Sequence, residues 1–421
     1  MQLDRITAVL DTAWREGLVG TDAAPAAIFY DLEAFRGAIA RIRSAFPANA
    51  LHTLAVKANP LASLLREAHR AGMGAECASL PELHHALRLG FPPADIVFDS
   101  PAKTPADLQF ALARGVHINV DNLQELDRLA ALANTAGRPI RAGIRVNPQT
   151  GAGRYAGTST AMATSRFGVP LQEERGRLLD AFAAFPWLVG LHVHTGSQVC
   201  PLELVVRGVA EIAGFAREIE RRRGRPLDVV DIGGGLPVDY ASDTSDTCLD
   251  DYVARLRREV PELARYRVVT EFGRAVSAKA GWAASRVEYA KCAGGRNIAV
   301  IHLGADFLVR TAYVPEVWVH RVTVHRPDGS PKSGPAVPQD IAGPLCFSGD
   351  LVARERPLPL AEPGDIVAIH DVGAYTLSMW SRYNSRQAPP VYAHEAAGAE
   401  VRLQLLKPAE TVDDVLRFWG P

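Results

Sequence analysis

The chain has 421 residues, of which 48% are hydrophobic and 22% charged, and its formal net charge is -1. This length predicts two domains, and the near-zero charge gives no reason to expect nucleic acid or a membrane surface as a partner. The five cysteines are scattered without CxxC pairs, which is typical of reduced thiols in a cytoplasm rather than a disulfide framework or a zinc site. The acids near the N-terminus and the lack of any apolar run approaching about 18 residues predict neither a signal peptide nor a membrane span. A cytoplasmic location is therefore expected.

The first part of the chain predicts a barrel. Residues 1–30 carry one expected strand, AAIFYD, and are expected to join a later β domain. Short apolar runs and longer amphipathic segments then alternate, as helical crossovers between parallel strands require. The expected strands are 51–57, 74–78, 95–100, 117–120, 141–147, 189–195, 227–233 and 267–273. Eight such units favour a parallel (β/α)₈ barrel over residues 31–275, although counting alone leaves an open doubly wound sheet possible. The long loop at 147–165 would then follow a barrel strand on the catalytic face, where loops of this length are often functional.

The pattern changes after residue 275. Helical periodicity fades, and short alternating runs such as VWVHRVTVH and EVRLQLL are separated by turn clusters such as RPDGSPKSGP. This pattern predicts an antiparallel β domain over residues 276–421. The expected fold class is therefore α/β, with a TIM-like barrel followed by a C-terminal antiparallel β domain.

Lys57 ends the first expected barrel strand, in LAVKANP. Barrel enzymes place catalytic groups at this end of their strands. A surface lysine at the start of a loop is the simpler interpretation. However, the apolar run before Lys57 suggests a packed stem, and packing lowers a lysine pKa and makes it a candidate for Schiff-base formation.

Two strand ends carry groups that suit a phosphate. DIGGGLP contains Gly233, Gly234 and Gly235, and three glycines let backbone N–H groups converge on an anion without Cβ interference. Glycine-rich turns are common, so this motif alone is weak. TGSQ, which includes Ser197, follows another expected strand and adds hydroxyl and backbone donors.

Four further titratable groups lie at or near strand ends. His194 lies two residues after His192, so the two rings are either a structural pair or include one that stacks on a flat cofactor. The neighbouring sequence supplies no ligands at metal-site spacing, so no metal is predicted. Glu271 and Arg274, in EFGR, form either a structural ion pair or a cofactor contact in which the glutamate keeps a pyridine nitrogen protonated.

The densest motifs of the β domain are GPLCFSGD and GAYTLSMWSRYNSR. Cys346, near Asp350, is either a positioned thiol acid or a buried inert cysteine. Tyr375, Tyr383 and Asn384 suit core or turn positions equally well.

Taken together, these segments resemble the fold-type III pyridoxal-phosphate (PLP) enzymes, and most of all the diaminopimelate decarboxylases. The resemblance runs from about residue 25 to 392. It rests on AVKANP, SPAKT, SRFG, HxHTGSQ, DIGGGLP, ExGR, CxSGD and GAYxxSM…YNSR, which occur in the family's order. Each motif alone is weak, but the set is specific. It implies a PLP-dependent amino-acid decarboxylase with a (β/α)₈ barrel and a β domain.

The resemblance also implies roles for individual residues. Lys57 resembles the Schiff-base lysine, His194 the residue stacked on the pyridine ring and Glu271 the partner of the pyridine nitrogen. Cys346 resembles the acid that protonates the reacting carbon, and in this family it reaches the active site of a neighbouring subunit, which implies a homodimer. The implied phosphate and cofactor contacts are Ser197, Gly233, Gly234, Gly235, Gly273, Arg274 and Tyr375. The implied substrate contacts are Arg274, Arg310, Tyr313, Phe347 and Tyr375.

The chain departs from the family at three places. Phe347 replaces the glutamate of Cys-Glu-Ser-Gly-Asp, which contacts the distal amino group of the substrate, and phenylalanine cannot accept a hydrogen bond from an ammonium group. Val314 stands where the family has tyrosine, with Tyr313 one residue early. EFGR replaces Glu-Pro-Gly-Arg, a change expected to be benign. The first two changes suggest a substrate other than meso-diaminopimelate, such as a citryl-linked diaminopropionate or a carrier-linked glutamyl group of a siderophore or antibiotic pathway. A true meso-diaminopimelate decarboxylase that makes L-lysine is the alternative.

Other classes fit less well. An amino-acid racemase would pair the pyridine nitrogen with arginine rather than Glu271. A non-catalytic PLP carrier would resemble the barrel alone, without Cys346 and Tyr375. A metal-dependent barrel hydrolase would need a ligand cluster that the sequence does not supply.

Overall fold

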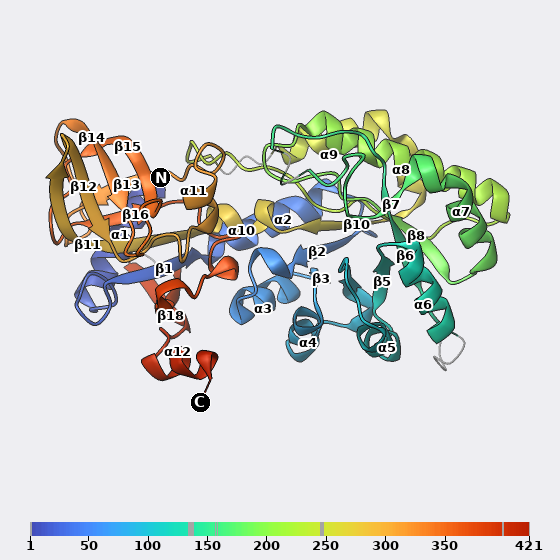
Figure 1. Ribbon diagram of the computed structural model, residues 1–421, viewed down its shortest axis with the longest axis horizontal. Coiled ribbons are helices and arrows are strands. Elements are labelled where there is room, and N and C mark those ends of the chain that lie inside the picture. The colour runs from blue at the N-terminus through green and yellow to red at the C-terminus, as the bar shows by residue number, and fades with distance from the viewer. Residues whose placement is uncertain are drawn as a thin grey trace. The chain divides into compact units, whose positions relative to one another are not determined.

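The computed structural model describes residues 2–133, 139–155, 157, 159–244, 248–397 and 400–420. It divides into two compact units (Figure 1). The barrel unit comprises residues 36–238 and 246–276, and the β unit comprises residues 1–35, 239–245 and 277–421. Within the described ranges, no helix is long and apolar enough to cross a membrane.

Eight parallel strands close into a barrel in the barrel unit. Their order is β5-β4-β3-β2-β10-β9-β8-β6, and pairing of β5 with β6 completes the ring. They are β2 (Leu51–Ala55), β3 (Gly74–Cys77), β4 (Ile96–Phe98), β5 (His117–Val120), β6 (Ala142–Asn147), β8 (Leu188–His192), β9 (Val229–Asp231) and β10 (Arg267–Phe272). A two-residue strand, β7 (Val169–Pro170), pairs with β6 outside the ring. The predicted barrel is confirmed, and the open-sheet alternative is excluded by the closing pair.

Helices surround these strands, as Figure 1 shows. They are α3 (Ala62–Arg70), α4 (Leu80–Arg88), α5 (Pro105–Arg114), α6 (Leu123–Ala133), α7 (Leu171–Ala184), α8 (Leu202–Arg223) and α9 (Leu249–Glu259). Local sequence sets several of their ends. Thr104 and Asp107 form a capping box at the start of α5, and Gly115 ends it in the left-handed region with φ 76°. Gly224 ends α8 in the same way, with φ 70°.

The β unit is built on a nine-stranded sheet. Its strands are β1 (Ala26–Asp31), β11 (Gly281–Ala293), β12 (Arg296–Ile301), β13 (Val322–His325), β14 (Ala336–Ala342), β15 (Leu351–Pro359), β16 (Ile366–Ile369), β17 (Val391–Ala397) and β18 (Glu400–Lys407). Its other elements include α1 (Gln2–Arg15), α11 (Val309–Tyr313) and α12 (Val412–Trp419). Helix α2 (Leu32–Ala45) leads into the barrel unit, and α10 (Arg274–Ser277) leads out of it. The predicted β domain is confirmed with one difference: β1 with β17 and β12 with β14 run parallel, so the sheet is mixed.

The N-terminal segment belongs to the core of the β unit. Strand β1 pairs with β11 and β17, and Phe29 stacks on Trp282 with ring centroids 4.4 Å apart. Helix α1 contributes Ile6, Val9 and Leu10 to the same cluster, and all three are nearly inaccessible to solvent. Burial of such aliphatic and aromatic side chains is the main favourable contribution to folding.

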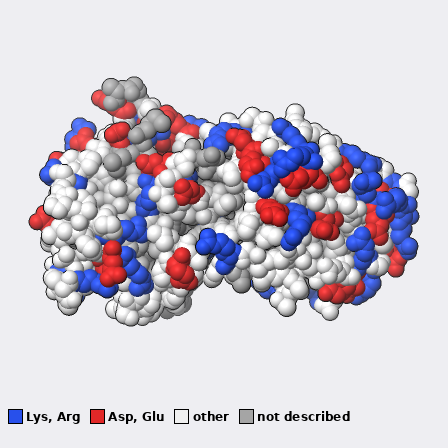
Figure 2. Space-filling model, turned by 90° about the horizontal axis from the view of Figure 1, so that it is seen from above, with Lys and Arg blue, Asp and Glu red and all other residues white. Residues whose placement is uncertain are grey.

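The surface carries charges of both signs. On the face shown in Figure 2, lysine and arginine side chains alternate with aspartate and glutamate, and neither sign forms a continuous field. This mixture agrees with the formal net charge of -1.

Buried histidines in the β unit are held neutral. The Thr323 hydroxyl lies 2.9 Å from Nε2 of both His325 and His370. Burial, reinforced by the nearby charge of Arg321, lowers the pKa of His370 to about 3. The stability that a neutral His370 contributes is therefore present above about pH 6.5, its ordinary pKa, and is lost as the pH falls toward 3.

We expect the free energy of unfolding to decrease as the pH falls below 6.5, and His370→Asn to flatten this dependence. Removing this one histidine reduces the slope of the unfolding free energy against pH by at most about 1.4 kcal/mol per pH unit. Urea unfolding of both proteins between pH 4.5 and 7.5 measures the two slopes. Equal slopes would contradict this role of His370.

Candidate active site

Lys57 stands at the carboxyl rim of the barrel. It occupies a 3₁₀ turn, Val56–Ala58, directly after β2, and its amino group contacts the carboxylate of Glu76 on β3. The Lys57 side chain is 36% exposed, whereas that of Glu76 is fully buried. Burial raises the pKa of Glu76 to about 8; Lys57 opposes this shift and Glu271 reinforces it. Lys57 is thus an amine that solvent can reach, paired with a buried carboxyl group.

The glycine-rich loop after β9 packs directly against the loop after β8. A Cβ on Gly234 would lie 2.3 Å from the carbonyl oxygen of Glu271, and one on Gly235 would lie 2.1 Å from that of Gly196. Gly233 and Gly235 also adopt φ values of 65° and 95°, which other residues rarely take. The predicted glycine set and the TGSQ segment with Ser197 therefore form one closely packed part of the rim, in which Gly235 and Ser197 are partly exposed. Successive backbone N–H groups in such turns suit an anion.

His194 faces this loop from the end of β8. Its Nδ1 accepts a hydrogen bond from the N–H of Gly234 at 3.1 Å. Burial, together with the charge of Arg145, lowers the pKa of His194 to about 3. The ring is therefore neutral, with its proton on Nε2, and offers a flat face at the rim.

Glu271 lies close to His192, a partner that the sequence analysis did not predict for it. It is 3% exposed on β10, and its Oε2 lies 3.6 Å from Nε2 of His192, the last residue of β8. Nδ1 of His192 lies 3.7 Å from a carboxylate oxygen of Asp99, which follows β4. Burial would raise the pKa of Glu271, but the charge of His192 lowers it below the ordinary range. A pattern of polar residues at strand ends, DIVFDS and VGLHVHT, was the available signal.

These three side chains also match the general chemistry of a metal site. Ligand atoms of Asp99, His192 and Glu271 all lie within 4.8 Å of one another. The sequence predicted no metal because the neighbouring residues lack ligand spacing, and the closed barrel brings the carboxylates from β4 and β10 to the histidine. However, the two ring nitrogens of His192 face different carboxylates, and a single cation coordinates only one of them.

The remaining charged groups of the rim are buried. Arg145, on β6, lies 3.3 Å from Asp99. Arg274 begins α10, directly after Gly273 and β10, and is 4% exposed. Both arginines were close in sequence to motifs, but only Arg274 was among the predicted site residues.

The loop at 147–165 lies against this rim where the structure describes it. The Thr160 N–H donates to the Thr195 carbonyl at 3.0 Å, and the Thr160 hydroxyl donates to the His194 carbonyl. Ser159 forms an isolated bridge with Gly196. Residues 156 and 158 lie outside the described part of this loop. The loop therefore supports the backbone that follows β8.

In the β unit, the YNSR segment holds the loop that carries Cys346. The Cys346 N–H donates to Asn384 Oδ1 at 2.8 Å, and the Tyr383 hydroxyl donates to the Cys346 carbonyl at 3.1 Å. Asp350 accepts hydrogen bonds from the N–H groups of Leu345 and Ala305. Cys346 itself is exposed in the chain. The interpretation of Cys346 as a buried inert thiol is therefore wrong, and Tyr383 and Asn384 support its loop.

Four further predicted residues form two contacts within the β unit. The rings of Tyr313 and Phe347 stack with centroids 5.3 Å apart and planes 11° apart. The Arg310 guanidinium lies 4.7 Å from the Tyr375 ring centroid and 4.9 Å from that of Trp318. The structure thus gathers the predicted substrate residues of this unit into an aromatic pair and an arginine packed on aromatic rings.

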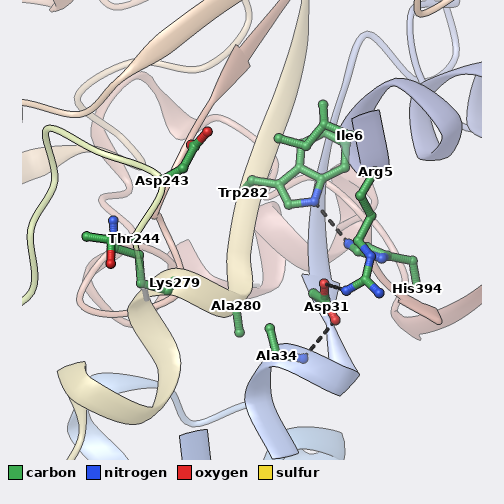
Figure 3. Close-up of a pocket in the computed structure, with 10 residues that line it drawn as sticks. All are labelled: Arg5, Ile6, Asp31, Ala34, Asp243, Thr244, Lys279, Ala280, Trp282 and His394. Atoms are coloured by element: carbon green, nitrogen blue, oxygen red, sulfur yellow. Dashed lines mark hydrogen bonds and ion pairs between the residues drawn. The ribbon is translucent and has the colours of Figure 1, made fainter. Parts of the chain in front are cut away.

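A cavity of about 610 Å³ in the β unit is separate from these groups (Figure 3). Its charged side chains are paired: Arg5 contacts Asp31, and Lys279 lies 2.9 Å from Asp371. The Trp282 indole donates to Nε2 of His394 at 3.1 Å. None of the predicted site residues lines this cavity, so it does not enter the candidate active site.

The barrel rim has groups that suit a ligand with three features: an anionic group, a flat ring that contains a nitrogen, and a carbonyl carbon. The glycine loop packs so closely on neighbouring backbone that no Cβ fits there, His194 offers a neutral ring, Glu271 offers a buried carboxylate and Lys57 offers an amine. PLP combines these three chemical features, so the residues present fit this cofactor. The fold and the site thus define a PLP enzyme of the barrel type.

The comparisons give the same class. Residues 32–278 match the model of the pyridoxal-dependent decarboxylases, pyridoxal binding domain. Diaminopimelate decarboxylase of Helicobacter pylori is 31% identical over 393 residues, covering 92% of this chain and 94% of the relative. That of Pseudomonas aeruginosa is 33% identical over 340 residues, covering 79% and 78%. A crystal structure of the Helicobacter pylori enzyme complexed with L-lysine matches with a TM-score of 0.83 at 28% identity, covering 94% of this chain and 96% of that one.

The chain belongs to the fold-type III PLP-dependent decarboxylases, in the diaminopimelate decarboxylase family. It is accordingly a PLP-dependent amino-acid decarboxylase.

We expect Gly234→Ala to weaken PLP binding at least about tenfold, since the new Cβ must displace the Glu271 carbonyl and the loop beside it. Gly214→Ala, in α8, is the matched control because its Cβ would meet nothing within 4 Å. Titration of the cofactor-free proteins with PLP, followed by absorbance, gives both dissociation constants. Equal affinity in the two variants would remove the glycine loop from the cofactor site.

Proposed function

We propose that this chain decarboxylates meso-diaminopimelate at one amino-acid centre and releases L-lysine. The observation that supports this substrate best is the likeness along nearly the whole chain to relatives that are themselves diaminopimelate decarboxylases. The geometry of the barrel rim agrees with the reaction class, because a buried carboxylate, a neutral histidine and a reachable lysine meet beside the glycine-rich loop.

The barrel residues would hold and orient the cofactor. Lys57 would bind its carbonyl carbon, and the backbone of Gly233–Gly235 with Ser197 would bind its phosphate. His194 would lie on the face of its ring. Glu271 would accept a hydrogen bond from its ring nitrogen and so keep that nitrogen protonated. When bound, PLP supplies a ring that accepts the electron pair left on the α-carbon as carbon dioxide departs.

The other assigned residues would handle the substrate. Arg274 and Arg310 suit carboxylates, because a guanidinium group donates two parallel hydrogen bonds to a carboxylate. The Cys346 thiol would give its proton to the α-carbon, and the resulting thiolate would recover a proton from solvent. Exposure of the Cys346 loop in the single chain supports a role that a second copy completes. We therefore propose a cytoplasmic homodimer in which Cys346 and Tyr375 contribute to the active sites.

One observation favours a second candidate, an amino acid whose distal end is not an ammonium group. Phe347 replaces the family's glutamate, and its ring is held between Tyr313 and an apolar cluster of Ala305, Ala312 and Leu345. This pair offers a flat apolar surface and no carboxylate acceptor at that position. A citryl-linked diaminopropionate or a carrier-linked glutamyl group would not need such an acceptor.

Release of carbon dioxide from meso-diaminopimelate by the PLP-loaded protein tests the first proposal. The first proposal predicts rapid release with L-lysine as the product, measured by chromatography. No release from a folded protein with bound cofactor would reject it and favour the second candidate.

The variant Phe347→Glu separates the two candidates further. Suppose first that the natural substrate lacks a distal ammonium group. The new carboxylate should then let the variant bind the distal ammonium group of meso-diaminopimelate, and kcat/KM for that compound should increase at least about tenfold, a gain of about 1.4 kcal/mol in transition-state binding. If meso-diaminopimelate is the natural substrate, the variant should show no such gain. Phe418→Glu, at an exposed phenylalanine of α12, controls for the added charge.

A further inference from the structure

The strongest unassigned feature of the barrel is a row of buried charged side chains from four strands. Arg145 lies 3.3 Å from Asp99, and His192 lies 3.7 Å from Asp99 on one side and 3.6 Å from Glu271 on the other. All four residues are at least nine-tenths buried, and His192 is completely inaccessible. From Arg145 to Glu271 the formal charges alternate if His192 is protonated.

Geometry indicates that His192 is an imidazolium. Each of its ring nitrogens faces a carboxylate oxygen at ion-pair distance, slightly beyond hydrogen-bond length, and only the protonated ring presents an N–H at both positions. Burial alone would lower the pKa of His192, but Glu271, Asp99 and Asp231 together raise it to about 9. A neutral ring would turn a lone pair toward one of the two carboxylates, which is unfavourable in a buried site.

Acidic and basic groups both surround Glu271. The titratable and charged groups around it, taken strand by strand, are Lys57, Glu76, Asp99, Arg145, His192, His194 and Asp231. Burial raises the pKa of Asp231 to about 8, and the negative charge of Glu271 reinforces this shift. His192, 3.6 Å from Glu271, lowers the pKa of Glu271 most and the charge of Lys57 adds to this effect, so Glu271 would take up a proton more readily without His192.

We propose that His192, held between Asp99 and Glu271, is a positioning residue that fixes the Glu271 carboxylate as the acceptor for the pyridine nitrogen of PLP. This inference rests on the proposed role of Glu271. A protonated Glu271 would donate a hydrogen bond to a neutral pyridine nitrogen rather than accept one from a protonated nitrogen, so the ring nitrogen would no longer be held protonated. His192 thus acts through Glu271 and needs no contact with the cofactor.

The test compares His192→Gln with wild type, using protein loaded with PLP labelled with ¹⁵N at the ring nitrogen. His117→Gln is the matched control, because His117 is a partly buried histidine of the barrel that is bonded to Asn119 and held neutral, with its pKa lowered to about 4 by desolvation. The ¹⁵N chemical shift reports protonation of the ring nitrogen directly. In His192→Gln, the pH midpoint of this protonation should fall by about 1 unit or more, whereas His117→Gln should leave it unchanged.

An unchanged midpoint in a folded, cofactor-bound His192→Gln protein would overturn the proposal. If that variant does not fold, ¹⁵N-histidine spectra of the wild-type protein decide the matter. An imidazolium that persists to about pH 8 and is lost in His192→Lys supports the proposal, and a neutral His192 ring at pH 7 overturns it. Stoichiometric Zn²⁺ in the purified wild-type protein, absent from the His192 variants, would also overturn it. If neither the wild-type protein nor Glu271→Gln bound PLP, the proposed function on which the inference rests would be rejected instead.

Discussion

Closure of the parallel barrel is the constraint on which the candidate active site depends. Strands β5 and β6 pair and complete the ring, so the carboxyl ends of all eight strands meet at one rim. Residues as distant in sequence as Asp99 and Glu271 become neighbours only through this closure. The rim must then hold charged groups away from water, which is costly unless each meets an opposite charge. The contacts of Lys57 with Glu76 and of His192 with two carboxylates meet this requirement.

Two physical properties of the rim work together. The glycine loop, Gly233 to Gly235, is packed too closely for any Cβ and suits a charged phosphate, and the buried carboxylate of Glu271 suits a protonated ring nitrogen. Both groups are fixed before a ligand arrives, so little reorganisation is required on binding. The residues proposed to contact the substrate belong to a different part of the chain. The stacked pair of Tyr313 and Phe347 and the arginine on aromatic rings, Arg310, lie in the β unit.

Much of the barrel was predictable from the sequence, because buried parallel strands are short apolar runs separated by amphipathic helices. The strand from His117 to Val120 was predicted to the residue, whereas the strand ending in His192 was predicted to run on to Thr195. The parallel pairs in the β unit were not predictable, since strand alternation shows which face is buried and not the direction of the neighbour. Motifs identified Lys57, His194 and Glu271 as candidates. Asp99 and Arg145 were missed because their significance lies in contacts between strands, which no local spacing reveals.

The most direct test of the account is to locate the covalent attachment of PLP. The cofactor-loaded protein is treated with borohydride, which reduces a Schiff base to a stable secondary amine, and the modified peptide is identified by mass spectrometry. The account predicts a single phosphopyridoxyl group on Lys57, and none on this peptide in Lys57→Ala. Stoichiometric modification of a different lysine, or none in a folded protein saturated with PLP, would contradict it.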